Sequence, residues 1–366
     1  MLNKLAKLIT EYCTNVKAGD EVLVISTYEA YPLVREIWRE VVVKGGYPRW
    51  SLNDEILNEI FYRHAPEELL RFQSRIDEFM SENVDVRISV LSSTHSKHLV
   101  SVDPERIKIR AQAMRKLSEI FMRRDSEGLL RWVVTAYPTR AMAQEANMSP
   151  LEYEDFVFRS LKLHAEDPVS AWVSQASLQQ RVAEVLSKVS ELRIVSDDTD
   201  ILLNVGGRVW INDDGRNNMP GGEVFTGPHE DFTEGFIRFD FPAVWRGVEV
   251  RNARLVFQRG EVVKADAEVG GELLRKMLET DEGARRLGEV AFGLNYDITR
   301  FTKEILFDEK IGGTIHMALG ASYLKTGGIN KSSIHWDLIK DMRRGKVFAD
   351  GELIYEDGRF IAEVVK

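Results

Sequence analysis

Residues 2–25, LNKLAKLITEYCTNVKAGDEVLVI, contain the pattern that decides the fold of the first part of the chain. Gly19–Asp20 forms a turn, and the apolar run Val22–Ile25 that follows it predicts a buried strand. Before the turn, apolar residues recur at the three- and four-residue spacing of a helix, at Leu2, Leu5, Leu8, Ile9 and Tyr12. The stretch therefore predicts a helix that leads directly into a strand.

The same alternation continues along the chain. A second helical pattern runs from about Pro32 to Lys44 and is stopped by Gly45–Gly46. Further strand-like runs at 86–90 and 132–134 alternate with helical stretches at 104–121 and from Met142 onward. Strands that alternate with helices of this length predict an α/β domain with a mainly parallel, helix-covered sheet.

The end of this domain is predicted from two helices. Ser149, Pro150 and Glu152 have the types and spacing of a helix start, with a serine N-cap, proline at the first position and glutamate three residues after the cap. A long helix is predicted from about Leu178 to Leu192, and the composition changes after it. We therefore expect two domains, residues 1–190 and 191–366.

The second domain has a β-rich pattern. Residues 192–205 and 248–269 are typical of strands joined by tight turns such as Arg259–Gly260. The chain then ends in a predicted hairpin with turns at Asp350–Gly351 and Asp357–Gly358.

Two short helical segments are predicted in this domain, at 271–279 and 282–290. The second domain is therefore expected to be an α+β domain built on a mainly antiparallel sheet.

Composition excludes several classes of protein. The chain has 366 residues, of which 44% are apolar, enough for two domains with a core each. The formal net charge of -9 argues against a nucleic-acid binder, which normally presents a basic face. No apolar run approaches the roughly 20 residues that span a bilayer, and the first residues are amphipathic rather than a signal peptide. A cytoplasmic protein without membrane contact is expected.

A single cysteine, Cys13, limits the possible chemistry. It excludes intramolecular disulfides, and a cysteine-based zinc cluster would need more thiols. Any metal must therefore be held by histidines and carboxylates.

Of the seven histidines, only His316 and His335 lie among apolar strand-like residues beside candidate acids. His335 and Asp337 are two positions apart, so on a strand both side chains project from one face. One strand thus offers an imidazole and a carboxylate to the same ion. The spacing also fits a buried hydrogen bond without metal, so the pair alone leaves both interpretations open.

Other segments place single ionisable groups in similar surroundings. An unpaired charge among glycines and apolar residues costs several kcal/mol, so several such segments indicate a shared counter-charge, supplied by one or two divalent cations. The segments are Gly221–Thr226 around Glu223, Leu287–Ala291 around Glu289, and Thr314–Gly320 around His316.

Each segment has a weaker explanation when it is taken singly. Glu223 could cap a turn, Glu289 could end a surface helix, and His316 could be a core histidine with a hydrogen-bond partner. Together, a metal site is the better account. Histidine and carboxylate ligands suit zinc, cobalt or manganese, and three carboxylates with two histidines suit two ions. The zincin signature His-Glu-x-x-His is absent.

At these residues the chain resembles a known family, the thermophilic metallo-aminopeptidases that include aminopeptidase T and aminopeptidase S, of the leucyl aminopeptidase type. The motifs occur in the family's order between about residues 218 and 342, and the opening helix and strand are similar to its first domain. The motifs are Gly-Gly-Glu-Val-Phe-Thr with Glu223, Leu-Gly-Glu-Val-Ala with Glu289, His-x-Ala-Leu-Gly-x-x-Tyr with His316 and Tyr323, and Ser-x-Ile-His-Trp-Asp with His335 and Asp337.

The resemblance implies an exopeptidase that removes N-terminal residues from peptides. It also implies a two-metal centre whose ligands match Glu223, Glu289, His316, His335 and Asp337, a catalytic tyrosine at Tyr323, and a homodimer. The metal is expected to be zinc, cobalt or manganese, and the partners are peptides with a free N-terminus.

Two ions about 3.5–4 Å apart lower the pKa of a shared water from about 15.7 toward 7, which makes hydroxide available at neutral pH. Tyr323 is expected to donate a hydrogen bond to the developing oxyanion. Glu289 is expected to be either a bridging ligand or the group that carries the proton to the leaving amine. A two-metal amidase or phosphoesterase, and a non-catalytic protein with a structural metal, remain alternatives.

Overall fold

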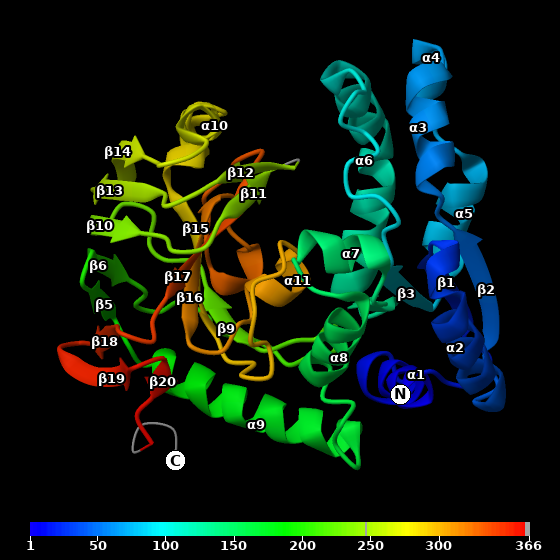
Figure 1. Ribbon diagram of the computed structural model, residues 1–366, viewed down its shortest axis with the longest axis horizontal. Coiled ribbons are helices and arrows are strands. Elements are labelled where there is room, and N and C mark those ends of the chain that lie inside the picture. The colour runs from blue at the N-terminus through cyan, green and yellow to red at the C-terminus, as the bar shows by residue number, and fades with distance from the viewer. Residues whose placement is uncertain (246, 363–366) are drawn as a thin grey trace. The chain divides into compact units, whose positions relative to one another are not determined.

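The computed structural model describes residues 1–245 and 247–362 (Figure 1). The chain divides into two compact units. The first consists of residues 1–169 with residues 216–219, and the second of residues 170–215 with the chain from Pro220 onward.

The first unit contains a parallel five-stranded sheet in the order β2-β1-β3-β4-β8, with helices around it (Figure 1). The predicted α/β domain is confirmed. Its strands are β1 (Glu21–Ser26), β2 (Tyr47–Leu52), β3 (Val86–Leu91), β4 (Arg131–Ala136) and β8 (Asn218–Met219). Its helices are α1 (Leu2–Lys7), the π-helix η1 (Leu8–Cys13), η2 (Tyr28–Ala30), α2 (Tyr31–Val43), α3 (Glu55–His64), α4 (Glu67–Leu70), α5 (Arg75–Asn83), α6 (Pro104–Ser126), α7 (Arg140–Glu145) and α8 (Pro150–Ser160).

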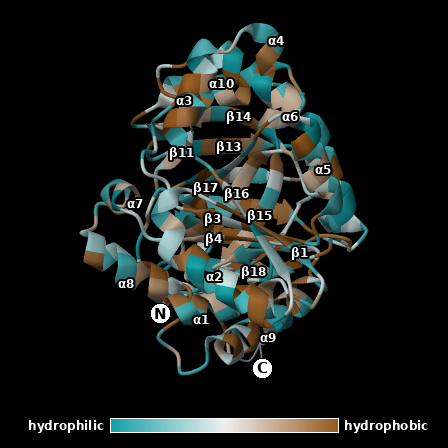
Figure 2. Ribbon diagram, turned by 90° about the vertical axis from the view of Figure 1, so that its right-hand side faces the viewer, coloured by the Kyte–Doolittle hydropathy of each residue, from teal (hydrophilic) through white to brown (hydrophobic). Residues whose placement is uncertain are grey.

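Both faces of β1 are covered. Leu23 packs with Leu130 and with Phe121 of α6, whereas Val22 and Val24 point to the opposite face and are fully buried. Hydrophilic and hydrophobic residues alternate along α6, as expected of a helix with one buried side (Figure 2). The predicted start of α8 is also confirmed, because Ser149 and Glu152 form a reciprocal capping box.

The long helix predicted at 178–192 is α9 (Pro168–Leu186), which begins and ends earlier. Its buried residues Val182 and Leu186 pack in the core of the second unit, to which all but its first two residues belong. The unit boundary therefore lies before most of this helix, whereas we expected it after the helix, near residue 190. Burial of a helix face in one core rather than another depends on contacts distant in sequence.

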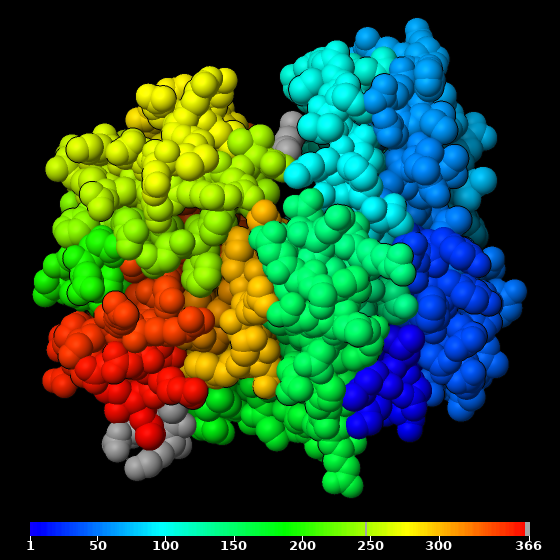
Figure 3. All heavy atoms as spheres, in the orientation of Figure 1, coloured from blue at the N-terminus to red at the C-terminus, as the bar shows by residue number. Residues whose placement is uncertain are grey.

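The second unit is built on two antiparallel sheets, in agreement with the predicted α+β class. The larger sheet has the order β14-β13-β10-β6-β5-β18-β19-β20, and its C-terminal hairpin, red in Figure 3, lies at the surface. Positive φ angles at Arg259, Asp350 and Asp357 and the glycines after them confirm the three predicted turns. The strands are β5 (Glu191–Ser196), β6 (Thr199–Asn204), β10 (Glu234–Arg238), β13 (Arg254–Gln258), β14 (Glu261–Asp266), β18 (Lys346–Ala349), β19 (Glu352–Glu356) and β20 (Arg359–Phe360).

The smaller sheet has the order β17-β16-β15-β9-β7. Its strands are β7 (Ile211–Asp213), β9 (Glu223–Thr226), β15 (Leu287–Gly293), β16 (Thr314–Gly320) and β17 (His335–Asp341). The other elements of the unit are the hairpin β11 (Ala243–Trp245) and β12 (Val248–Val250), and the helices α10 (Gly271–Leu278), η3 (Glu282–Arg285), α11 (Ile305–Asp308) and η4 (Leu324–Thr326).

The prediction of a helix at 282–290 is wrong. Only η3 is helical, and β15 begins at Leu287 as a strand buried along its whole length. The strand forms because β9 and β16 pair with it on its two sides. Glu289 consequently lies inside a sheet and not at the end of a surface helix.

The core of the second unit includes apolar side chains from both sheets. Leu255 and Phe257 of the larger sheet belong to the same buried cluster as Phe292 and Met317 of the smaller one. One face of the smaller sheet is therefore buried in this core. Among the described residues, no helix combines the length and the apolar character needed to cross a membrane.

A partly buried charge network joins the two sheets. Asp198, in the turn between β5 and β6, accepts hydrogen bonds from Lys340 of β17 at 2.7 Å and from Arg238 of β10. Burial by itself would raise the pKa of Asp198, but Lys340 and Arg238 lower it to about 2. Because this pKa lies below that of an unfolded aspartate, about 3.9, the ionised group stabilises the folded state above that pH.

Replacement of the Asp198 carboxylate should destabilise the protein by an amount that depends on pH. Asp198→Asn is expected to lower the free energy of unfolding by about 1–3 kcal/mol at neutral pH, because Lys340 loses a charged partner. The difference from the wild type should shrink as the pH falls from about 4 toward 2, where the wild-type carboxylate itself becomes protonated. Denaturant unfolding across this pH range measures it, with the exposed pair variant Glu272→Gln as control. An equal loss at every pH would contradict this assignment.

Candidate metal centre

The five predicted ligands project from one face of the smaller sheet, here called the ligand face. Residues paired directly across two strands share a face, as do residues two apart on one strand. The register gives the pairs Glu223 with Gly293, Glu289 with Ala318, His316 with Ala291, His335 with Gly320 and Asp337 with Ala318. The sheet therefore brings together residues that are more than 100 positions apart in the chain.

Each ligand has glycine or alanine opposite it on one neighbouring strand, whereas on the other neighbouring strand Glu223 is paired with Asp213 and His316 with Ile339. Directly opposed side chains have Cβ atoms only about 4.5–5.5 Å apart, so a large partner would fill the space above the ligand. The glycine and alanine partners leave that space open on their side of each ligand. The opposite face carries Val290, Met317 and Trp336, which are buried in the core of the unit.

Glu289 lies at the centre of the site. Its Oε1 is 3.0 Å from Nε2 of His316, and its Oε2 is 3.9 Å from Nε2 of His335. The two oxygens of one carboxylate thus face two different histidines. Nε2 of His316 is also 3.4 Å from Glu223 Oε2, and Nε2 of His335 is 3.6 Å from Asp337 Oδ1.

These residues form two groups that suit a metal ion. Glu223, His316 and Glu309 form one group, and Glu289, His335 and Asp337 the other; within each group the ligand atoms lie within 4.8 Å of one another. The five predicted residues are therefore brought together, and Glu309 is an additional candidate that the sequence analysis missed. It follows α11, outside the strands, where no two-residue period marks it.

The orientation of His335 fits a metal ligand. Its Nδ1 donates to the carbonyl oxygen of Ala321 at 2.8 Å, so that in the neutral ring the lone pair is on Nε2. That lone pair faces the carboxylates of Glu289 and Asp337. Buried Glu223 Oε2 and Asp337 Oδ1 have no hydrogen-bond partner in the described part of the chain. Buried oxygens without hydrogen-bond partners, beside an imidazole lone pair, are the kind of donor atoms that bind a divalent cation.

Sequence analysis also missed a buried lysine, Lys310. Its side chain is fully buried, with Nζ 3.6 Å from Glu223 Oε1 and 3.7 Å from Asp213 Oδ2, and it forms an ion pair with Glu309. A buried charge requires such partners. Lys310 thus neutralises part of the acidic cluster and holds Glu223 in place. No periodic pattern marks it, because it lies in a loop before Gly312–Gly313.

Burial and the crowding of like charges shift the ionisation of the site. Burial raises the pKa of Glu223 well above its usual value, and raises that of Asp213 to about 7. Burial by itself would lower the pKa of His316, but the hydrogen bond to Glu289 and the charge of Glu223 raise it to about 10. All three shifts favour positive charge at this place, carried by a proton or by a metal ion.

Tyr323 lies beside the second ligand group. Its ring centroid is 5.1 Å from that of His335 and 5.6 Å from that of Phe225, and half of the residue's surface is exposed. Burial of its hydroxyl and the charges of Glu289 and Asp337 raise the pKa of Tyr323. The phenol therefore stays protonated at neutral pH and remains a hydrogen-bond donor.

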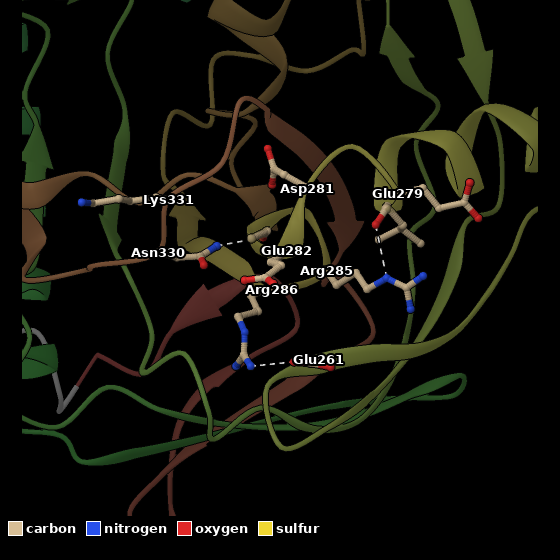
Figure 4. A pocket seen from close by; sticks show the side chains of 10 residues that line it. Glu261, Glu279, Asp281, Glu282, Arg285, Arg286, Asn330 and Lys331 are labelled. Carbon is tan, nitrogen blue, oxygen red and sulfur yellow. Dashed lines mark hydrogen bonds and ion pairs between the residues drawn. The ribbon is translucent and has the colours of Figure 1, made fainter.

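A cavity of about 750 Å³ is present in the same unit, outside the predicted metal site (Figure 4). It is lined by charged residues that include Glu261, Arg285 and Arg286, and by none of the predicted site residues. Arg286 pairs with Glu261, and Arg285 donates to the carbonyl oxygen of Leu278. This cavity is therefore not assigned a catalytic role, although it is large, because it contains none of the predicted site residues.

Two adjoining groups of histidine and carboxylate side chains that could hold metal ions, with a tyrosine beside them, are an arrangement typical of metal-dependent hydrolases. The model of the thermophilic metalloprotease (M29) family matches residues 1–360, so the chain belongs to this family.

The relatives cover the same length. Aminopeptidase 2 of Geobacillus stearothermophilus is 29% identical, over 97% of this chain and 98% of the relative. Aminopeptidase AmpS of Bacillus subtilis (strain 168) is 27% identical over 98% of both chains. The structure of wild-type AmpT from Thermus thermophilus superposes with a TM-score of 0.85 and 26% identity, over 99% of both chains. This agreement confirms the predicted fold class and the predicted family.

The small residues of the ligand face should be necessary for metal binding. Ala318 stands opposite both Glu289 and Asp337, so Ala318→Val would place two methyl groups between ligands. We expect a loss of metal affinity of roughly 10- to 100-fold with the fold retained. Metal analysis after dialysis and circular dichroism measure the two effects. Met317→Leu, on the opposite face, should keep its metal. Full metal content in Ala318→Val would exclude this role for the alanine.

Proposed function

We propose that this chain is a metal-dependent aminopeptidase that hydrolyses the N-terminal peptide bond of peptides at a two-metal centre. Metallopeptidase chemistry follows from the family, and the relatives named above are aminopeptidases. The observation that carries the two-metal centre is the carboxylate of Glu289, whose two oxygens face the two histidine-containing groups.

In this proposal Glu223, His316 and Glu309 would hold one ion, and His335 and Asp337 would hold the other. Glu289 faces both groups, which favours the role of a ligand shared by the two ions over that of a proton carrier. Imidazole and carboxylate donors suit zinc, cobalt or manganese. Bound ions of this kind polarise a carbonyl and lower the pKa of a water toward about 7.

The protein residues orient the reacting groups. Lys310 keeps the carboxylate of Glu223 turned toward His316, and the carbonyl of Ala321 keeps Nε2 of His335 turned inward. Tyr323 donates a hydrogen bond to the oxygen of the scissile carbonyl as negative charge develops on it. A donor in this position contributes about 3 kcal/mol to the transition state.

The acidic ligand face supports selection for a free N-terminus. An α-ammonium group brings positive charge to a site rich in carboxylates, whereas an acetylated terminus brings none. The homodimer and the cytoplasmic location stay predictions.

The substrate class is tested with matched substrates. In the presence of added zinc, cobalt or manganese, leucine p-nitroanilide should be hydrolysed, and chelation should abolish the reaction. N-acetyl-leucine p-nitroanilide should react at least about 100-fold more slowly, because it lacks the amine. Equal rates for both would support a general amidase, and faster hydrolysis of p-nitrophenyl phosphate would support a phosphoesterase.

Variants at the site separate a ligand from a donor. Glu289→Gln and His316→Ala should abolish turnover with the fold intact and should lower the metal content. Tyr323→Phe should retain its metal and lose roughly 100- to 1,000-fold in kcat. Tyr28→Phe, an exposed tyrosine in the first unit, serves as the matched control. Wild-type kcat in Tyr323→Phe would indicate a structural role for the tyrosine, and wild-type kcat in the ligand variants would refute the site.

A further inference from the structure

A second cavity, of about 180 Å³, shares a wall with the metal centre. His335 and Asp337 line it, together with apolar residues of β17 and of two other segments of the second unit, 242–245 and 301–308. β17 is the edge strand of its sheet, and the β11–β12 hairpin packs against it. The cavity therefore lies at the edge of the sheet, next to His335 and Asp337, two of the proposed metal ligands.

The walls of this cavity are aromatic and aliphatic. Trp245 and Trp336 line it and pack edge to face with ring centroids 6.4 Å apart. Phe301 and Ile305 also line it, and Phe301 stacks on Phe241 at 5.4 Å. These contacts hold the walls in place without a ligand, so the cavity is formed in advance.

The remaining ionisable residues of the lining are already paired. Lys303 forms an ion pair with Glu249 at 2.7 Å, and Asp308 accepts hydrogen bonds from the backbone and hydroxyl of Thr302 at 2.7 and 2.9 Å. Among the described residues of the lining, a charged ligand group would therefore find no available partner beyond the metal ligands themselves. The lining favours an apolar occupant.

The size of the cavity matches one side chain. Pockets for whole small-molecule ligands start at about 300 Å³, which is larger than this cavity. We propose that it is the pocket for the side chain of the substrate's N-terminal residue, and that it selects large apolar and aromatic residues over small and charged ones. The proposal rests on the proposed aminopeptidase function.

The position of the pocket assigns it to the first residue of the substrate. In that residue one carbon carries the side chain, the free amine and the scissile carbonyl, so its side chain lies next to the groups that bind at the metal centre. The side chain of the second residue is separated from them by the amide being cut. A pocket whose wall includes His335 and Asp337 is adjacent to the first of these two side chains.

The test compares p-nitroanilides of leucine, phenylalanine, alanine, lysine and glutamate. The wild type should favour leucine and phenylalanine over alanine by about 10- to 200-fold in kcat/KM. Trp245→Ala should reduce this ratio at least about 10-fold. Ile305→Glu, at a residue that is 45% exposed, should keep the fold and shift the preference from leucine toward lysine. Phe236→Ala, 44% exposed on β10, is the control that should change no ratio.

A binding experiment is independent of turnover. In the metal-free protein, saturation-transfer NMR should detect leucinol but not alaninol, and Trp245→Ala should remove the leucinol signal. Unchanged substrate ratios in both variants, or a wild-type preference for lysine or glutamate, would overturn the pocket. The pocket assignment would also be overturned if Trp245→Ala and Ile305→Glu changed the preference for the second residue of Leu-Xaa dipeptides and not for the first residue of the substrate. If alanine p-nitroanilide is hydrolysed in these cases, the proposed function stands without the pocket. No hydrolysis of any anilide would overturn both.

Discussion

Successive side chains of a β-strand point to opposite faces, and the second unit depends on this constraint. On the smaller sheet the period of two sends Val290, Met317 and Trp336 into the core and Glu289, His316 and Asp337 to the ligand face. The apolar face fixes the register, because a shift by one residue would bury the ligands and expose the core. Hydrophobic burial therefore positions a polar site that would be costly to assemble by itself.

The ligand face concentrates negative charge, and the surrounding structure partly compensates for it. Lys310 is a fully buried cation among Glu223, Asp213 and Glu309, and the two histidines lie between carboxylates. Each of these groups would be destabilising without its neighbours. Each ligand has glycine or alanine on one neighbouring strand, which leaves room beside it, so the site has both the charge and the space that divalent ions require.

One edge strand serves both chemistry and selectivity in this proposal. β17 contributes His335 and Asp337 to the ligand face, and the same residues with Trp336 form part of the apolar pocket. Because the amine, the carbonyl and the side chain of an N-terminal residue share one carbon, adjacent sites for them restrict the enzyme to chain ends. Trp245 and Ile305 lie outside the ligand set, so the preferred residue could vary among relatives without change to the metal centre.

Local patterns in the sequence determined strands β1, β3 and β4 of the first unit, the capping box at Ser149, the three Gly-containing turns and the shared face of His335 and Asp337. Each depends on residues within a few positions of one another. Tertiary structure decided the rest: Glu289 is on a strand because β9 and β16 pair with it, and α9 joins the second unit through its core contacts. Glu309 and Lys310 enter the site from a loop, where no periodicity identifies them. Their roles depend on which distant carboxylates lie nearby, and chain spacing alone does not specify that proximity.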